Sequence, residues 1–79
     1  MGEMKLVSVI YLNEQIGGYV GREYAYIDPT GGQLKVGDKV IVPAGSENER
    51  KKAMVVDTDV SVPPEIQKKL KSVLGRSKT

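Results

Sequence analysis

The stretch Leu34-Lys-Val-Gly-Asp-Lys-Val-Ile-Val-Pro43 decides the fold of this 79-residue chain. Gly37 suits a tight turn that needs a positive φ, and Asp38 can hydrogen-bond to backbone amides beyond the turn. After the turn, Val40 and Val42 alternate with residues of the opposite face, which is typical of a strand with one buried side. The stretch therefore predicts a turn followed by a half-buried strand.

Breaker residues divide the rest of the chain into short segments. Pro43 lacks an N–H, so it ends the ladder of hydrogen bonds or lies at a sheet edge. Asn13 to Gly18 and Asp28-Pro-Thr-Gly-Gly32 have the composition of turns, and Ala44 to Arg50 is a polar loop. We expect the chain to reverse direction at each of these positions.

Three further segments are predicted as strands. Lys5 to Leu12 is dense in β-branched residues and is apolar on both faces, Tyr19 to Ile27 alternates, and Lys52 to Asp57 returns along the strand before it. Gly21 marks a bulge or bend in the second of these strands. Short strands with regular turns predict a mainly β fold, a small SH3-like or OB-like barrel of four to five strands over residues 1–61.

Residues 62–79 change to a helical period, so we expect a C-terminal α-helix and tail within the same single domain. Pro63-Pro64-Glu65 suits a helix start, and Gly75 suits its C-terminal cap. The apolar positions at helical spacing are Ile66, Leu70, Val73 and Leu74. This stripe is predicted to pack on the outer face of the barrel; an alternative is that it docks on a partner.

The chain contains no His, Cys, Trp or Phe, and these absences argue against catalysis. There is no thiolate nucleophile and no zinc cluster, and the serines have no histidine to activate them. Asp57 and Asp59, with Asp28 from another loop, could share a cation, but acids flanking a threonine at a strand end are more often solvated. We expect no enzyme, no catalytic residue, no cofactor and no metal.

Charge and hydropathy restrict the partners. Residues 1–61 carry seven Lys/Arg and nine Asp/Glu, a net charge of −2, whereas residues 62–79 carry five Lys/Arg and one Glu, a net charge of +4. The basic end indicates either an anionic partner or a solvated lysine-rich face. The longest apolar run, Leu6 to Leu12, is too short to span a bilayer. We expect no membrane partner and, from the missing cysteines, a cytoplasmic protein.

Two tyrosines and an arginine share one face of the predicted second strand. Arg22, Tyr24 and Tyr26 are spaced two residues apart, and small barrels use such a face to stack exposed bases while a cation meets phosphate. The alternative is that both tyrosines close one end of the core and keep only their hydroxyl groups at the rim. The sequence leaves both interpretations open.

A second cationic edge is predicted beside the polar loop. Its members are Arg50, Lys51 and Lys52. In a nucleic-acid complex these side chains would contact phosphates.

The order of these segments resembles a known family. Tyr24-Ala-Tyr26, a turn, Leu34 to Gly45, a basic loop and Ala53-Met-Val-Val56 are similar to the N-terminal β-barrel of the primosomal replication-restart helicase PriA. Short phage-type and Firmicute-type proteins with a Val-Gly-Asp-x-Val-x-Val-Pro motif are similar too. The resemblance implies binding of DNA at a fork and of the 3′ end of a nascent strand. By position, it implies contacts from Gly45 to Lys51 and from Asp28 to Gly32.

The sequence thus predicts a non-enzymatic barrel that binds nucleic acid, either single-stranded or branched DNA. Its predicted contacts are Arg22, Tyr24, Tyr26, Gly45, Arg50, Lys51 and Lys52. The alternative is a phage-derived or orphan module for protein–protein interaction, which a nearly neutral barrel with acidic Glu47 and Glu49 in its loop also fits.

Overall fold

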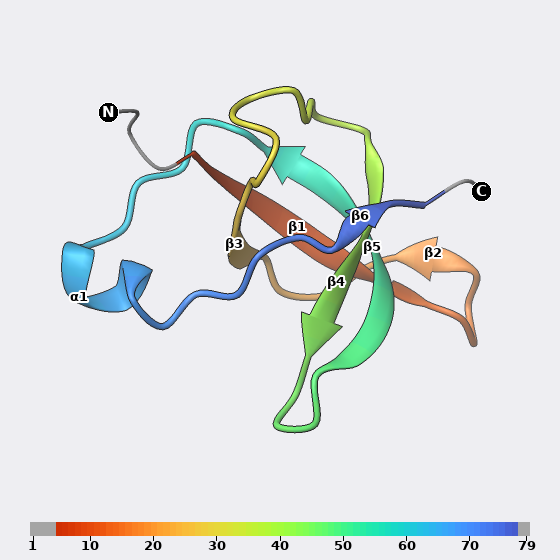
Figure 1. The fold of residues 1–79 in the computed structure, drawn as a ribbon. Helices are drawn as coiled ribbons and strands as arrows, with labels where there is room; N and C mark the ends of the chain where they lie inside the picture. The colour runs from red at the N-terminus through yellow and green to blue at the C-terminus, as the bar shows by residue number, and fades with distance from the viewer. Residues whose placement is uncertain (1–4, 78–79) are drawn as a thin grey trace.

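Strand β1 (Leu6–Asn13) lies at the centre of the fold, which the computed structural model describes for residues 5–77 (Figure 1). It pairs on one edge with β3 (Tyr24–Ile27) and on the other with β5 (Glu49–Asp57), and β5 pairs in turn with β4 (Lys39–Ala44). All of these pairs are antiparallel. The mainly β class expected from the alternating valines is confirmed.

The predicted second strand is divided into two pieces. Strand β2 (Gly18–Tyr19) pairs with the end of β1, and β3 pairs with its beginning. Leu12 and Val9 lie three positions apart on β1, whereas their partners Tyr19 and Tyr24 lie five positions apart. The two extra residues, between β2 and β3, do not pair with β1, and Gly21 in this segment adopts a φ of 110°.

The C-terminal helix is much shorter than predicted. Helix α1 (Pro64–Gln67) begins at the expected prolines but is four residues long, and none of its residues is buried. Gly75 does not cap it: strand β6 (Gly75–Arg76) pairs antiparallel with Val40 and Ile41 of β4. The stripe prediction was therefore wrong. Of its four members, Val73 alone is buried, at 4% exposed, and Leu74 is 54% exposed, as in an extended chain with alternating faces.

Backbone pairing explains why this segment is extended. The Ile27 amide donates to the Lys71 carbonyl at 2.9 Å, and the Val73 amide donates to the Ile27 carbonyl at 3.0 Å. On the other side, the Leu74 amide donates to the Ile41 carbonyl at 2.8 Å. Residues 71–76 thus lie between β3 and β4 and close the sheet into a small barrel. A helix here would have left backbone groups of both strands unpaired.

The core fills the inside of this barrel. Val40 and Val42 are fully buried, as their alternation predicts, and Ile41 lies on the outer side. The core cluster comprises Val7, Val9, Tyr26, Leu34, Val40, Val42, Ala53, Val55 and Val73. Val73, which follows position 61, thus packs into the same core as the strands.

The prediction for Gly37 is confirmed, whereas Asp38 bonds to a different part of the turn from the one predicted. Gly37 has a φ of 96°, as predicted. Asp38 accepts a hydrogen bond from the Lys35 amide at 2.9 Å, so it fixes the turn before it and not the amides beyond it. Pro43 continues in β4 opposite Arg50, at a position where β6 no longer covers the strand. It therefore lies at an edge.

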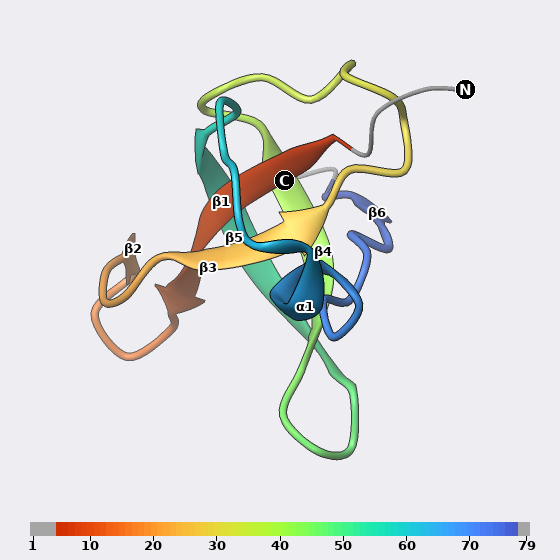
Figure 2. The same ribbon diagram turned by 90° about the vertical axis from the view of Figure 1, so that its left-hand side faces the viewer.

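In the part of the chain that the structure describes, no helix lies across the outer face of the barrel. Helix α1 projects to one side, away from the β4–β5 surface (Figures 1 and 2). Ile10 and Met54 face each other across β1 and β5 and are half-buried, as is Ile41. The predicted packing of an apolar helical stripe on this face is not observed, since the backbone that would have formed it closes the barrel.

Candidate functional site

Three tyrosines meet at one end of the barrel, the end from which the β4–β5 hairpin loop (residues 45–48) projects. We call it the tyrosine end. Tyr11 continues the inward face of β1 beyond Val7 and Val9, and Tyr24 and Tyr26 lie on the adjacent β3. The rings of Tyr11 and Tyr24 are stacked, with centroids 4.7 Å apart and planes 13° from parallel. The strand pairing thus builds an aromatic stack across the mouth of the core.

The Tyr26 hydroxyl group lies beneath this stack in a polar chain. It donates to the Pro43 carbonyl at 2.7 Å, and it lies 2.6 Å from the Tyr11 hydroxyl oxygen. Since Tyr26 has one hydroxyl proton, which Pro43 accepts, Tyr11 is the donor to Tyr26. Burial, the hydrogen bond with Tyr11 and the nearby phenols of Tyr11 and Tyr24 raise the pKa of Tyr26 well above its ordinary value. Tyr26 is therefore a neutral donor at any physiological pH.

Tyr24 and Tyr26 differ sharply in exposure, although they share one face of β3. Tyr26 is 5% exposed and Tyr24 is 41% exposed. Tyr26 lies opposite Val7, deep in the barrel, whereas Tyr24 lies opposite Val9, closer to the mouth. Tyr26 is thus a core residue, as the alternative interpretation held, and its ring is not available for base stacking. Tyr24 presents the accessible ring.

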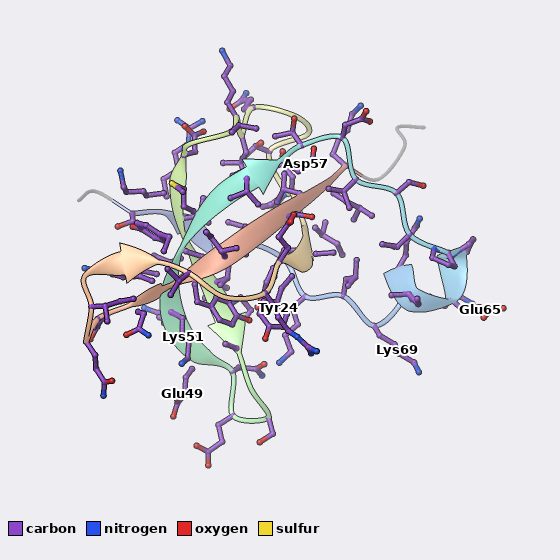
Figure 3. The ribbon with its side chains drawn as sticks, turned by 180° about the vertical axis from the view of Figure 1, so that it is seen from behind. Tyr24, Glu49, Lys51, Asp57, Glu65 and Lys69 are labelled. Carbon is purple, nitrogen blue, oxygen red and sulfur yellow. The ribbon has the colours of Figure 1, made fainter. Side chains whose placement is uncertain are left out.

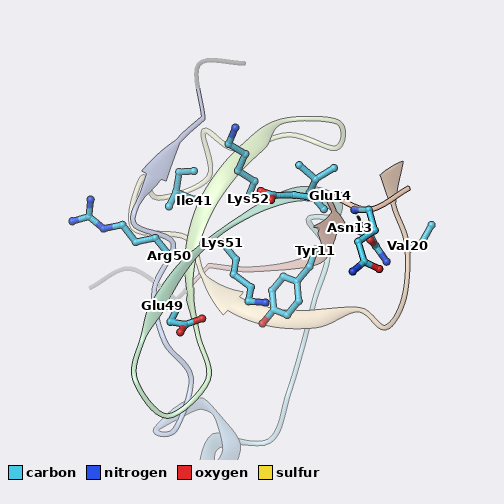
Figure 4. Close-up of a pocket in the computed structure, with 11 residues that line it drawn as sticks. Tyr11, Asn13, Glu14, Val20, Ile41, Glu49, Arg50, Lys51 and Lys52 are labelled. Carbon is cyan, nitrogen blue, oxygen red and sulfur yellow. Dashed lines mark hydrogen bonds between the residues drawn. The ribbon is translucent and has the colours of Figure 1, made fainter. Parts of the chain in front are cut away.

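One of the three predicted cations of β5 reaches the aromatic stack. The Lys51 ammonium nitrogen lies 5.9 Å from the centroid of the Tyr11 ring, within range of a cation–π contact. Tyr11, on the strand between β3 and β5, therefore contacts both Tyr24 and Lys51. Figure 4 shows Lys51 directed towards Tyr11, and Arg50 and Lys52 directed away from it.

A groove of about 880 Å³ separates these cations from the end of β1. Pairing of β1 with β5 stops at Tyr11 and Ala53, and the two strands diverge beyond that point. Arg50, Lys51 and Lys52 line one side of this groove, and Glu14 and Glu49 also line it. Its charge is consequently mixed.

The remaining predicted contacts lie apart from each other. Arg22 is exposed in the segment between β2 and β3. Gly45 begins the β4–β5 loop with a φ of 74°, and its carbonyl accepts a hydrogen bond from the Lys71 ammonium group at 2.8 Å. Tyr11, Lys69 and Lys71 were missed from the sequence as candidates. The inward alternation of Tyr11 with Val7 and Val9 was the available signal for Tyr11.

The Asp28–Gly32 turn is a closed structural unit at the opposite end. Asp28 is 4% exposed, and its carboxylate accepts from the Thr30 hydroxyl and amide at 2.5 and 2.8 Å and from the Gly32 amide at 3.1 Å. Burial opposes the charge of Asp28, but the bonds from Thr30, Gly32 and Leu34 outweigh it and lower the pKa of Asp28. Its oxygens are therefore engaged within their own turn.

Asp57 and Asp59, which were considered as cation ligands and set aside, form a local turn. Asp57 accepts a bond from the Asp59 amide at 2.9 Å. Among residues 5–77, no three acidic side chains lie close enough together to hold a metal ion. In the same part of the chain, no helix is long and apolar enough to cross a membrane.

Comparisons with family models, with curated proteins and with solved structures find no match to this chain.

Proposed function

We propose that this protein is a non-enzymatic barrel of the cytoplasm that binds single-stranded or branched DNA at its tyrosine end. The observation that carries the proposal is the stack of Tyr24 on Tyr11 with Lys51 beside it. One face of the Tyr24 ring is occupied by Tyr11, so the ring is held rigidly while it stays 41% exposed. A rigid, accessible aromatic ring beside a cation suits a base and its phosphate.

The residues around this stack have separate roles in the proposed binding. Tyr26 positions the stack from below through the Tyr11 hydroxyl group, and Lys51 supplies positive charge next to it. Arg50 and Lys52 are exposed on the same strand and add attraction for a phosphate backbone. Figure 3 shows Tyr24 and Lys51 at the same end of the barrel, with Glu49 nearer to the hairpin tip.

A titration of the isotopically labelled chain with an eight-residue oligothymidylate at 50 and 200 mM salt tests the proposal. We expect amide shifts at Tyr11, Tyr24, Gly45 and Lys51, and weaker binding at the higher salt concentration because phosphate contacts release counterions. Tyr24→Ala should weaken binding about 5- to 100-fold, the range for loss of one stacked base, whereas Tyr24→Phe keeps the ring and should bind nearly normally.

Lys51→Ala is compared with Lys39→Ala, which removes the same charge from the far end of β4. Lys51→Ala should weaken binding more than Lys39→Ala. No binding at 50 mM salt, or shifts confined to other parts of the barrel, would contradict the proposal.

One observation favours the rival proposal, a protein-interaction module. Ile10, Ile41 and Met54 are half-buried on the outer face, and Leu74, whose amide bonds to Ile41, is 54% exposed. No element within residues 5–77 packs across this strip, and such strips often mark protein contacts. The same DNA titration separates the two proposals, because the first predicts shifts at Tyr24 on addition of DNA and the second does not.

A further inference from the structure

A second hollow at the tyrosine end opens through the wall of the barrel between β3 and β4. The closing segment pairs with Ile27 of β3 and with Val40 and Ile41 of β4, and it reaches neither Tyr24 nor Pro43. This leaves an opening of about 350 Å³ that Tyr24, Tyr26 and Pro43 line from the two strands and Gly45 lines from the β4–β5 loop. The Tyr26 hydroxyl bridges it at depth by its bond to the Pro43 carbonyl.

The rim of this opening is positively charged. Lys69 and Lys71, from the segment after α1, both line it, and none of the lining residues within 5–77 is acidic. The groove beside β5 differs in this respect, because Glu14 and Glu49 lie among its cations. An anion is therefore better accommodated in the β3–β4 opening than beside Lys51.

Lys71 is held in place for such a contact. Its ammonium group donates one hydrogen bond to the Gly45 carbonyl at 2.8 Å, across the opening from its own segment. An ammonium group has three donors, so two remain for a ligand. Lys69 is exposed on the segment that follows α1 (Figure 3). The Tyr24 ring, stacked on Tyr11 by one face, lines the same opening.

We propose that the β3–β4 opening binds a backbone phosphate of single-stranded DNA through Lys69 and Lys71, next to a base stacked on Tyr24. The inference rests on the proposed function and makes it more specific. The bound DNA strand leaves the stack towards the C-terminal segment and not towards Glu47 and Glu49. It also selects unpaired bases, because a base inside a duplex has both faces covered by its neighbours and cannot stack on Tyr24.

The test measures fluorescence anisotropy of labelled oligothymidylate with the full chain and with Lys69→Ala and Lys68→Ala. These two variants lose the same charge from adjacent exposed positions, and Lys69 alone of the two lines the opening. We expect Lys69→Ala to weaken binding about 2- to 5-fold at 50 mM salt. The slope of log K against log salt should fall by about 0.7, the value for one phosphate contact on a single strand. Lys68→Ala should leave the slope unchanged.

The outcomes separate the inference from the function on which it rests. Wild-type binding that Tyr24→Ala weakens but Lys69→Ala and Lys68→Ala affect equally would overturn the phosphate site and leave the proposed function standing. Absence of wild-type binding would overturn both. Equal affinity for a duplex of the same length would also overturn the inference, since paired bases cannot reach Tyr24. A loss specific to Lys69→Ala, with preference for the single strand, supports it.

Discussion

The two ends of the barrel satisfy their polar groups in different ways. At the Asp28 end, a buried carboxylate accepts bonds from the hydroxyl and amides of its own turn, and the chain there is closed on itself. At the tyrosine end, a chain of hydroxyl groups fixes the stack from below while one ring and two lysines stay exposed. The first arrangement stabilises the fold, and the second prepares a surface. Side chains with unused donors or open ring faces gather at the second end.

Removal of the Asp28 carboxylate should give the largest loss of stability. In Asp28→Ala, the amides of Thr30 and Gly32 lose a charged acceptor, and we expect unfolding to become easier by about 2–3 kcal/mol. For a domain of this size, 1 kcal/mol lowers Tm by about 4–8 °C. Thermal unfolding followed by circular dichroism measures the change.

The matched control for Asp28→Ala is Asp57→Ala, an exposed aspartate with one local bond to the Asp59 amide. Its cost should stay below about 1 kcal/mol. Equal losses in the two variants would show that the closed turn contributes no more than an ordinary solvated one.

Tyr26→Phe should have a smaller effect, at the opposite end. It leaves the Pro43 carbonyl and the Tyr11 hydroxyl without the Tyr26 partner, at a cost of about 1–2 kcal/mol measured by urea unfolding. Tyr24→Phe, on the exposed ring, should change stability by less than about 0.5 kcal/mol. A Tyr26→Phe protein as stable as wild type would mean that the hydroxyl chain does not hold the stack.

Acid should weaken the Asp28 end by the smallest amount. The pKa of Asp28 is lowered in the folded state, so its charge contributes stability above the ordinary unfolded value of about 3.9, and this contribution is lost as pH falls through the folded pKa. The difference in unfolding free energy between wild type and Asp28→Asn should be constant from pH 7 to about pH 5 and shrink below about pH 4. A difference that grows on acidification would reverse the sign of the shift.

The sequence predicted correctly those segments in which the apolar residues follow a single spacing, either that of a strand or that of a helix. Alternating Val40 and Val42 after Gly37 specify a strand with one buried face, and the structure has it. The C-terminal segment was mistaken because Ile66, Leu70 and Val73 fit a helical spacing as well. The segment is extended because the backbone groups of β3 and β4 that face each other need hydrogen-bond partners. Those unpaired edges exist only once the barrel has assembled.

The candidate site was predictable only in part for a related reason. The spacing of Tyr24 and Tyr26 places both on one face, but their depth in the barrel depends on the register with β1. Lys69 and Lys71 entered the sequence analysis only through the net charge of residues 62–79. The helix expected there did not place them beside Tyr24. Their place beside Tyr24 follows from the extended path of the closing segment.

That closing segment also has a consequence for how the chain folds. Pairing of β1 with β5 joins Ser8 to Asp57, 49 positions along the chain, and ring closure joins Ile27 to Ser72, 45 positions along it. Contacts between such distant residues carry a large loop-closure entropy and slow the folding of the chain. Because the β1–β5 pairing and the ring closure bridge similar lengths of chain, we expect the barrel to form in one slow cooperative step. The same step would then order Lys69 and Lys71 beside Tyr24.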